Sequence, residues 1–308
     1  MIENRRILVL GASGRVGRPL ALHLAAKNTV FGVSRFSDPN DEQALQASGV
    51  RTIRKDLADP GPGLLDGIPQ DVDYLVNQAV LWKAEPPVTW QQIFELNAIA
   101  GPRILQHCRA SLKSCVYGST GGNYNSHPQP RSEEDEPISD GRIYHTSKIA
   151  GEFCADLASR LFHVPTAILR YYFPCGRDSG SLRGLGIRLL KGESKKISKG
   201  DTFGHHFTWM GDILRMTERA LEIAAVPAVF VNVAGREFII ERIAVEKMAA
   251  ALGVPARFTE STESRTPFLA DLAKMRALLG EPEGTFDQMV AEASEGLRAN
   301  PPESLKGE

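Results

Sequence analysis

A tyrosine and a lysine stand four positions apart in the run Tyr144-His145-Thr146-Ser147-Lys148. On a helix, residues at i and i+4 share one face, so this spacing puts the phenol and the ammonium side by side. A phenol has an unperturbed pKa near ~10, and a neighbouring cation lowers that pKa by stabilising the phenolate. The pair therefore predicts proton exchange between Tyr144 and a carbonyl or alcohol oxygen, with Lys148 as electrostatic partner.

Two hydroxyl residues, Ser119 and Thr120, end a strand-like run ahead of this pair, and Thr120 precedes Tyr144 by 24 residues. A lone Tyr-x-x-x-Lys pair is weak evidence, because solvated helices carry such pairs by chance. The order and spacing of hydroxyl, phenol and ammonium favour a chemical site over a solvated surface pair.

A glycine-rich turn lies near the start of the chain. Gly11, Gly14 and Gly17 follow the aliphatic run 6–10 and open a helical pattern at 15–27. A strand, a glycine turn and a helix in this order let the backbone approach a pyrophosphate, and the helix N-terminus favours its negative charge. The turn therefore predicts a dinucleotide site.

Strand and helix patterns alternate through the first half of the chain, which is typical of βαβ units and a parallel sheet. Such sheets bind ligands at the carboxyl ends of their strands. We therefore predict an α/β fold with a Rossmann-like doubly wound parallel sheet. The predicted strands are 6–10, 29–34, 50–54, 72–77, 112–117, 166–172 and 228–233, and the predicted helices are 15–27, 88–110, 144–162, 212–225, 241–252 and 269–279.

The composition excludes several classes of protein. Among 308 residues, 36 Lys and Arg nearly balance 37 Asp and Glu, so neither a nucleic-acid partner nor a polybasic membrane anchor is expected. No apolar run approaches the ~18–20 residues of a spanning helix, and the short run after the N-terminus reads as a strand. We expect no membrane partner and a cytoplasmic location. The cysteines have no zinc-ligand spacing, so no metal is expected, and only Cys175 is a candidate reactive thiol.

Several further positions match one family. Asp56-Leu57 follows the third predicted strand, Asn77-Gln78-Ala79 follows the fourth, and Asn97 lies in the long helix after it. With the glycine spacing, the Tyr144–Lys148 pair and the strand Leu169–Tyr172, they make the chain resemble the extended short-chain dehydrogenase/reductases, the NAD-dependent epimerase/dehydratase family. The resemblance covers nearly the whole chain.

The resemblance implies roles for these residues. Thr120 takes the place of the family hydroxyl that holds the substrate oxygen, with Ser119 as the alternative. It implies a dinucleotide-binding domain, 1–172 with 205–233 returning to it, and a smaller C-terminal substrate domain, 173–204 and 234–308. It also implies a substrate between the two domains and a hydride passing to or from nicotinamide C4. The residues expected at the cofactor are Gly11, Ser13, Gly14, Arg15, Val16, Gly17, Ser34, Arg35, Asp56, Leu57, Gln78, Ala79, Asn97, Tyr144 and Lys148.

The end of the second predicted strand favours NADP(H) over NAD(H). An NAD-specific site usually places an acidic residue there to bind the ribose hydroxyls, and this chain has Ser34-Arg35 instead. Arg35 can pair with a 2′-phosphate, Ser34 can hydrogen-bond it, and Arg15 is a further candidate. We therefore expect NADP(H) as the preferred cofactor, with NAD(H) possible.

The reaction type is narrowed by the residues directly after the catalytic hydroxyl. Family dehydratases carry an acidic pair there, and here Gly121 and Gly122 follow Thr120, so dehydration is set aside. Three possibilities remain. They are a dehydrogenase or reductase acting on a small carbonyl or alcohol, a nucleotide-sugar 4-epimerase, and a non-catalytic NADP-binding sensor. The intact Tyr144–Lys148 pair argues against the sensor.

Two departures from the family favour a small substrate. Nucleotide-sugar members carry an asparagine and an arginine that contact the diphosphate, and the matching residues here are Phe173 and His205. Histidine is mostly neutral at pH 7 and lacks the guanidinium fork. Both are predicted to contact a less polar, small-molecule substrate instead. Related enzymes pair through the helices that correspond to 88–110 and 144–162, so a homodimer is expected.

Overall fold

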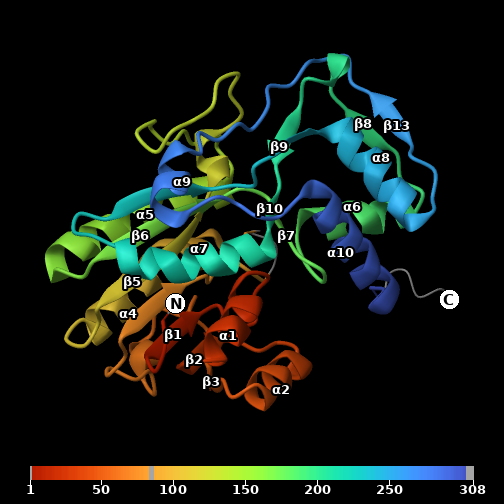
Figure 1. The fold of residues 1–308 in the computed structure, drawn as a ribbon. Coiled ribbons are helices and arrows are strands. Elements are labelled where there is room, and N and C mark those ends of the chain that lie inside the picture. The colour runs from red at the N-terminus through yellow and green to blue at the C-terminus, as the bar shows by residue number, and fades with distance from the viewer. Residues whose placement is uncertain (1, 83–86, 303–308) are drawn as a thin grey trace. The chain divides into compact units, whose positions relative to one another are not determined.

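The computed structural model describes residues 2–82 and 87–302. Within them, seven strands form one sheet in the order β11-β6-β5-β4-β1-β2-β3 (Figure 1). The pairs β1–β2, β2–β3, β1–β4 and β4–β5 all run parallel. The predicted α/β fold with a Rossmann-like parallel sheet is confirmed. The strands are β1 (Arg6–Leu10), β2 (Thr29–Ser34), β3 (Arg51–Arg54), β4 (Tyr74–Asn77), β5 (Ser114–Thr120), β6 (Thr166–Tyr171) and β11 (Val229–Val233).

The strand order reverses beside β1. The chain runs outward from β1 through β2 to β3 and then returns to place β4 on the other side of β1. The turns after β1 and β4 therefore leave the sheet next to each other, at the topological switch point where such sheets bind ligands. The glycine turn and the segment Asn77-Gln78-Ala79 are these two turns.

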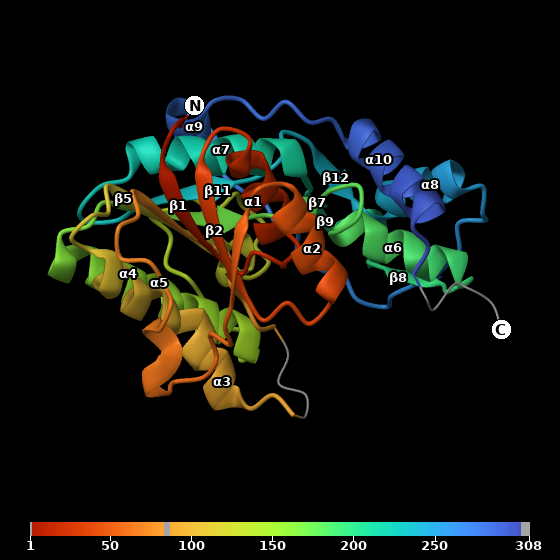
Figure 2. The ribbon, with the colours of Figure 1, turned by 90° about the horizontal axis from the view of Figure 1, so that it is seen from below.

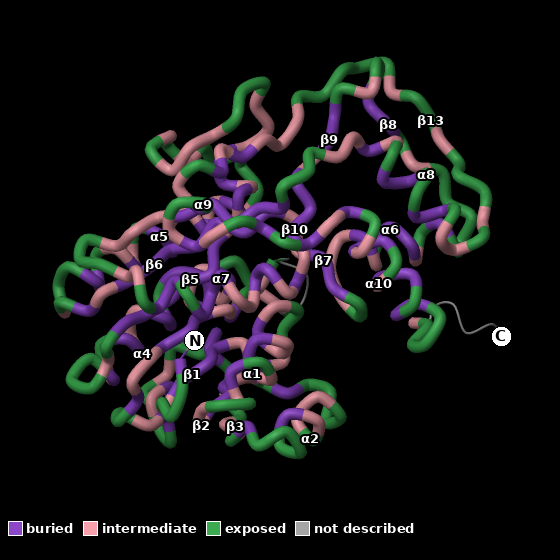
Figure 3. The backbone as a smooth tube through the Cα atoms, in the orientation of Figure 1, coloured by how far each residue is buried: buried purple, intermediate pink, exposed green. Residues whose placement is uncertain are grey.

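Helices cover both faces of the sheet, as Figure 2 shows, with α4 and α5 on one face and α1 and α7 on the other. The central strands are therefore apolar along their length rather than alternating, as expected for a parallel sheet covered on both sides. Every residue of β6 is buried, and Figure 3 shows the central strands in the buried colour. The helices around the sheet are α1 (Gly17–Ala25), α2 (Pro39–Ala47), α3 (Trp90–Phe94), α4 (Gly101–Cys108), α5 (Ile143–Phe162) and α7 (Met210–Ile223).

The helix predicted over 88–110 differs from the one observed. A capping box at Thr89 starts α3, and a π-helical segment, Glu95–Ala100, then separates α3 from α4. A π-helical turn adds a residue to the turn and re-aims the backbone carbonyls, and such turns are often found at functional sites. Here the segment contains Asn97, whose contacts are described with the active site.

The helix predicted to begin at Asp212 also differs from the observed one. Helix α7 begins at Met210, and Asp212 lies in its first turn rather than capping it. Its carboxylate accepts hydrogen bonds from the backbone N–H groups of Glu283 and Gly284, both at 2.9 Å. The aspartate therefore fixes a distant loop, a contact that sequence spacing alone does not reveal.

The chain divides into two compact units. Unit 1 comprises Met1–Asn123, Pro137–Arg170 and Leu214–Val231, and unit 2 comprises Tyr124–Glu136, Tyr171–Ile213 and Asn232–Glu308. The predicted domain boundaries concern ligand binding and stay a prediction.

Unit 2 is built around three helices, α6, α8 and α10, which pack on one another. Gly186 of α6 lies so close to α10 that a β-carbon there would be 2.4 Å from a Leu297 methyl. Three short strand pairs, β10–β7, β12–β9 and β13–β8, complete the unit. Its elements are β7 (Pro174–Cys175), α6 (Ser181–Leu190), β8 (Lys195–Ile197), β9 (Gly204–His206), β10 (Thr208–Trp209), β12 (Phe238–Ile240), α8 (Glu241–Leu252), β13 (Phe258–Glu260), α9 (Ala273–Leu279) and α10 (Phe286–Ala299).

Candidate active site

The predicted hydroxyl and phenol meet at the end of β5. Thr120 is the last residue of that strand and Tyr144 is the second residue of α5, and the two side chains lie close enough for the Thr120 hydroxyl to act on the pKa of the Tyr144 phenol. Ser119 is only 6% exposed and donates its hydroxyl to Glu152 Oε1 at 2.5 Å. Thr120 is partly exposed, so its hydroxyl is the better placed of the two to meet a substrate.

Lys148 lies one helical turn after Tyr144 and is 2% exposed. Its Nζ donates to the Tyr117 hydroxyl at 3.0 Å and to the Gly118 carbonyl at 2.6 Å. Burial lowers the pKa of Lys148 to about 7, and the negative charge of Glu152 acts in the opposite direction. The ammonium is therefore a buried charge that titrates near neutral pH.

The pKa of Tyr144 differs from the sequence-based expectation. Burial raises it, and the hydrogen bond with Thr120 acts in the opposite direction. The predicted lowering by Lys148 was wrong for the chain by itself, because the ammonium is bonded to Tyr117 and Gly118. At neutral pH Tyr144 is therefore a neutral phenol, which can donate a proton.

The glycine turn is shaped by close backbone approaches. Gly11 has a φ of +76°, and a β-carbon there would lie 2.6 Å from the Ala79 Cα on the neighbouring turn. A β-carbon on Gly17 would lie 2.1 Å from the Gly11 carbonyl oxygen. In the described chain no side chain caps the start of α1 at Val16. The turn therefore has the compact backbone and uncapped helix start that suit a phosphate group.

The residues predicted to select the cofactor lie at the ends of β1 and β2. The Ser13 and Ser34 hydroxyls are hydrogen-bonded at 2.6 Å, so the glycine turn meets the end of β2 there. Arg35 is exposed next to Ser34. The Arg15 guanidinium instead lies over the ring of Trp82, 5.8 Å from its centre, and Trp82 follows β4 rather than β2.

The other predicted cofactor residues occupy different environments. Asp56 is exposed, with its carboxylate accepting the Ala58 N–H at 3.0 Å, and Leu57 is buried. The Gln78 carboxamide packs so closely on Gly118 that a β-carbon there would lie 2.3 Å from its oxygen.

Asn97 is 1% exposed, and its side chain is bonded within the protein. The amide donates to the Leu81 carbonyl at 2.7 Å and to the Ser147 hydroxyl at 2.9 Å, and its oxygen accepts the Leu81 N–H at 2.8 Å. The side chain thus joins the segment after β4 to α5. Its place in the site remains a prediction.

A buried ion pair beneath these residues was not anticipated from the sequence. Arg170 of β6 binds both oxygens of Glu152 at 3.0 and 2.8 Å, and the two side chains are 3% and 2% exposed. Asn123 donates to the same carboxylate at 2.8 Å. Glu152 follows Lys148 by four residues, so the rule that placed Tyr144 beside Lys148 also puts Glu152 on that face.

The model of the NAD dependent epimerase/dehydratase family matches residues 7–230, which include the glycine turn and the Thr120, Tyr144 and Lys148 cluster. The chain belongs to this family. It is thereby an enzyme of the extended short-chain dehydrogenase/reductase type, as the resemblance indicated.

Relatives and solved structures of this family cover the chain almost end to end. An uncharacterized UDP-glucose epimerase, YtcB of Bacillus subtilis, is 26% identical over 98% of this chain and 94% of its own length. The UDP-glucuronic acid 4-epimerase of Bacillus cereus, solved with UDP-glucuronic acid and NAD, has a TM-score of 0.81 at 23% identity over 96% of this chain and all of its own. DesIV, a dTDP-glucose 4,6-dehydratase of Streptomyces venezuelae solved with NAD, has a TM-score of 0.83 at 20% identity over 98% and 100% of the two chains. At these identities the solved structures establish the fold.

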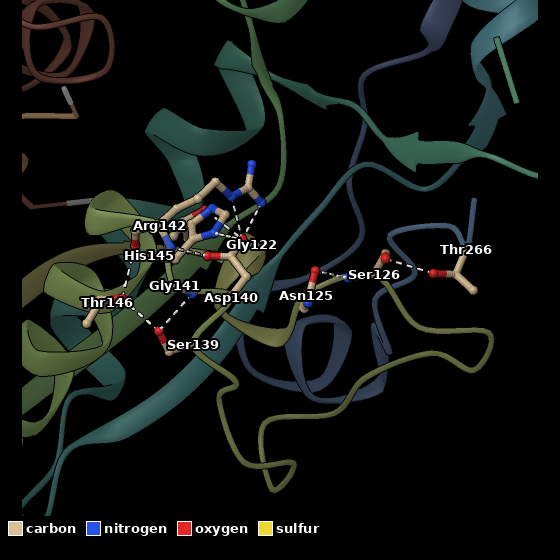
Figure 4. A network of polar contacts seen from close by, with 11 residues as sticks. Gly122, Asn125, Ser126, Ser139, Asp140, Gly141, Arg142, His145, Thr146 and Thr266 are labelled. Carbon is tan, nitrogen blue, oxygen red and sulfur yellow. Dashed lines mark hydrogen bonds and ion pairs between the residues drawn. The ribbon is translucent and has the colours of Figure 1, made fainter. Parts of the chain in front are cut away.

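One departure from the family's dehydratases has a structural counterpart. A β-carbon on Gly122 would lie 2.6 Å from His145 Nε2, so the imidazole occupies the space beside the turn that comes after Thr120. His145 Nδ1 and Asp140 Oδ2 are 2.8 Å apart, and Figure 4 shows Arg142 and His145 converging on that carboxylate. Burial opposes ionisation of Asp140, but bonds from Arg142 and His145 lower its pKa to about 2. The His145 imidazole, held by Asp140, thus explains why residue 122 is a glycine.

The two residues predicted to contact substrate meet in unit 2. The rings of Phe173 and His205 are stacked with centroids 4.0 Å apart, and Phe203, Phe207 and Phe268 surround them. Burial lowers the pKa of His205 to about 3, with the charges of Lys195 and Arg265 acting in the same direction. The imidazole is therefore neutral.

His206 is adjacent to His205 but points elsewhere. Its Nδ1 is 2.8 Å from the Gly235 carbonyl oxygen, so the two imidazoles lie on opposite faces of β9, as their adjacency predicts. Among the described residues, no group of His, Cys, Asp or Glu is arranged to hold a metal ion, and no helix is long and apolar enough to span a membrane.

The cysteines within residues 2–82 and 87–302 are unpaired. Burial raises the pKa of the Cys175 thiol to about 12, which keeps it protonated and removes the basis for a reactive role.

Proposed function

We propose that this enzyme transfers a hydride between NADP(H) and a small carbonyl or alcohol substrate. The observation that carries the proposal is the cluster of Thr120 at the end of β5, Tyr144 on α5 and, one helical turn later, the buried ammonium of Lys148. A nicotinamide cofactor, when bound, supplies or accepts the hydride. The glycine turn fits the pyrophosphate of such a cofactor, because Gly11 and Gly17 leave no room for a β-carbon.

The protein's own residues would handle the proton. Thr120 orients the substrate oxygen by hydrogen bonding, and Tyr144 exchanges a proton with that oxygen. Because burial raises the pKa of Tyr144, the phenol is protonated at neutral pH and is ready to protonate a carbonyl oxygen as it becomes an alcohol. Two hydrogens of the Lys148 ammonium are bonded to Tyr117 and Gly118, so the third would be the donor to the nicotinamide ribose of a bound cofactor.

The environment of His205 supports a small substrate. A neutral imidazole stacked on Phe173 offers no charge to a diphosphate, and we propose that these two residues contact the substrate. Three arginines in this region, Arg177, Arg183 and Arg188, offer another route to a diphosphate, and the first two already have partners. Arg177 pairs with Glu295 at 3.0 Å, and Arg183 donates to the Asn300 carbonyl at 2.5 Å.

The preference for NADP(H) rests on the end of β2. Ser34 is held there by Ser13, and Arg35 is exposed beside it. A guanidinium and a hydroxyl suit a 2′-phosphate, and no acidic residue stands directly at the end of the strand to bind the ribose hydroxyls of NAD(H). The solved relatives contain NAD, so NAD(H) remains the competing cofactor in any test of this preference.

We further propose a homodimer formed through α3, α4 and α5. Phe153, Leu157 and Leu161 recur every four residues on α5 and are 64%, 55% and 62% exposed. Such a stripe lies on one helix face, and burying it in a partner would remove it from water.

We also propose a division of the chain by ligand. Residues 1–172 and 205–233 would bind the dinucleotide, and residues 173–204 and 234–308 would bind the substrate. The enzyme would act in the cytoplasm.

A nucleotide-sugar 4-epimerase is the second candidate, and the comparisons favour it. YtcB is named a UDP-glucose epimerase, and the Bacillus cereus structure is that of a UDP-glucuronic acid 4-epimerase. The same threonine, tyrosine and lysine serve a 4-epimerase, which uses its bound cofactor in both directions. The two proposals differ in the molecule that Phe173 and His205 contact, which is a small carbonyl or alcohol compound in the first and a nucleotide sugar in the second.

One screen separates the two functions. Purified protein would be assayed with NADP⁺, NADPH, NAD⁺ and NADH against alcohols, aldehydes, ketones and UDP- or GDP-sugars. We expect a change in cofactor absorbance with a small carbonyl or alcohol. Sub-millimolar binding of a nucleotide sugar and its conversion to the epimer would establish the epimerase instead.

A further inference from the structure

The buried lysine is held by a tyrosine other than Tyr144. Tyr117 of β5 is 2% exposed, and its hydroxyl accepts a hydrogen bond from Lys148 Nζ at 3.0 Å. The same hydroxyl donates its hydrogen to the backbone carbonyl of Asn97, in the π-helical segment. Since a phenol has one hydrogen, the bond to Asn97 leaves the oxygen facing Lys148 as an acceptor.

We infer that Tyr117 is a positioning residue for Lys148, and that its hydroxyl, oriented by the Asn97 carbonyl, holds the ammonium in place and keeps it charged. This inference rests on the proposed role of Lys148. It assigns a task to a residue that the sequence presents only as part of a buried strand.

The groups around Lys148 explain why a neutral acceptor matters. Glu152, the carboxylate on the same helix face, is bonded to Arg170 of β6, to Ser119 and to Asn123. Lys148 makes its own bonds elsewhere, so the carboxylate acts on it through its charge. Lys148 Nζ instead donates its hydrogen bonds to the Tyr117 hydroxyl and the Gly118 carbonyl.

A glycine on α5 supports the same interpretation. A β-carbon on Gly151 would lie 2.0 Å from the Tyr117 hydroxyl oxygen and 2.3 Å from the Asn97 carbonyl oxygen. The bridge from Lys148 through Tyr117 to Asn97 therefore fits only beside a residue without a side chain. This gives a second, independent position at which the bridge can be broken.

The test measures the titration of Lys148 directly and needs no substrate. The full-length protein would be labelled with ¹³C at lysine Cε and titrated by NMR, with the Lys148 signal assigned by its absence in Lys148→Met. In Tyr117→Phe the ammonium loses one acceptor, so its midpoint is expected to fall by about one to two pH units. Gly151→Ala should move it in the same direction.

Tyr124→Phe is the matched control. Tyr124 is 1% exposed and its hydroxyl donates to Asn232 at 3.0 Å, so this variant also loses a buried hydroxyl, but not one bonded to Lys148. Its Lys148 midpoint should equal that of the wild type. An unchanged midpoint in folded Tyr117→Phe and folded Gly151→Ala would overturn the inference, whichever reaction the enzyme catalyses. A shifted midpoint in an enzyme without hydride-transfer activity would support the bridge and refute the proposed function.

Discussion

Two buried basic side chains, Lys148 in unit 1 and His205 in unit 2, have opposite surroundings. Lys148 in unit 1 is surrounded by oxygens and has a pKa of about 7, because the acceptors and the Glu152 charge offset part of the cost of burial. His205 in unit 2 is surrounded by aromatic rings, and its pKa is about 3. One environment is built to keep a charge and the other to exclude it.

On the proposed function, the difference separates the residues of the chemical step from those that contact substrate. Thr120, Tyr144 and Lys148 agree with the family pattern, and we propose an acid–base role for them. His205 and Phe173 depart from it, and their contacts are those of an apolar surface. A fold can thus keep one reaction centre while its substrate region changes character. Variants at both sites test this difference.

The largest expected effect is that of Tyr144→Phe, which removes the proposed proton donor next to Lys148. Loss of a positioned acid–base group typically costs ~10²–10⁴ in rate. We expect turnover to fall by that factor while the Kd for NADP⁺ stays near the wild-type value, since the proposed contacts to the cofactor phosphates are made by other residues. Steady-state kinetics and a cofactor titration check this. Turnover close to wild type would remove Tyr144 from the chemistry.

Lys148→Met should remove activity and raise stability. The pKa of Lys148 is lowered from its ordinary value of 10.5 to about 7 in the fold, so between those values the unfolded chain binds more protons. Stability therefore rises with pH across this window, and the charged lysine costs most below pH 7. We expect the Tm of Lys148→Met to exceed that of wild type at pH 6, and the gain to shrink towards pH 10. A Tm below wild type at pH 6 would contradict this.

Arg35→Ala tests the cofactor preference of unit 1. A charge-assisted hydrogen bond contributes ~1.5–3 kcal/mol, so the affinity for NADP⁺ should fall by about 10- to 100-fold while that for NAD⁺ stays the same. Arg54→Ala is a control, since this neighbouring arginine binds the backbone carbonyls of Arg35 and Phe36. Titration of both cofactors measures the result. Equal or tighter NAD⁺ binding in the wild type would refute the preference.

The sequence predicted unit 1 well because its signals are local. The strand, glycine turn and helix are consecutive, and Tyr144 and Lys148 lie one turn apart, so periodicity alone places them. In the structure the glycine turn lies against the turn after β4, since a β-carbon on Gly11 would be 2.6 Å from the Ala79 Cα. Parallel strands alternating with helices leave few alternative topologies.

The missed features depend on contacts between distant segments. Tyr117 reads as one more buried strand residue, and only the fold places it between Lys148 and the Asn97 carbonyl. Arg170 lies 18 residues from the carboxylate it binds. The raised pKa of Tyr144 results from burial, which residue spacing cannot report.

Gly122→Ala tests whether the Asp140–His145 pair fixes the turn after Thr120. The new methyl would lie 2.6 Å from His145 Nε2, so the imidazole must move. Overpacking typically costs ~1–3 kcal/mol, and we expect lower stability and a lower kcat, because the Gly122 N–H bonds the Thr120 hydroxyl at 3.1 Å. In Gly184→Ala, on α6, the added β-carbon meets nothing within 4 Å, so this control should keep both values. Unchanged kinetics in Gly122→Ala would separate the pair from the site.

The smallest expected effect, in His205→Phe, addresses the aromatic side of the comparison. A phenyl ring keeps the stack on Phe173 and removes Nδ1, which is buried without a hydrogen-bond partner among the described residues. Stability should therefore hold or increase slightly, since an unsatisfied buried polar atom is costly. If the imidazole contacts substrate as proposed, we expect KM to rise by about 2- to 10-fold with little change in kcat. A rise of this size corresponds to the free energy of one neutral hydrogen bond. Thermal melts and steady-state kinetics with the substrate found in the screen measure both. An unchanged KM would mean that His205 only packs in unit 2, and a lower Tm would mean that its nitrogen has a partner after all.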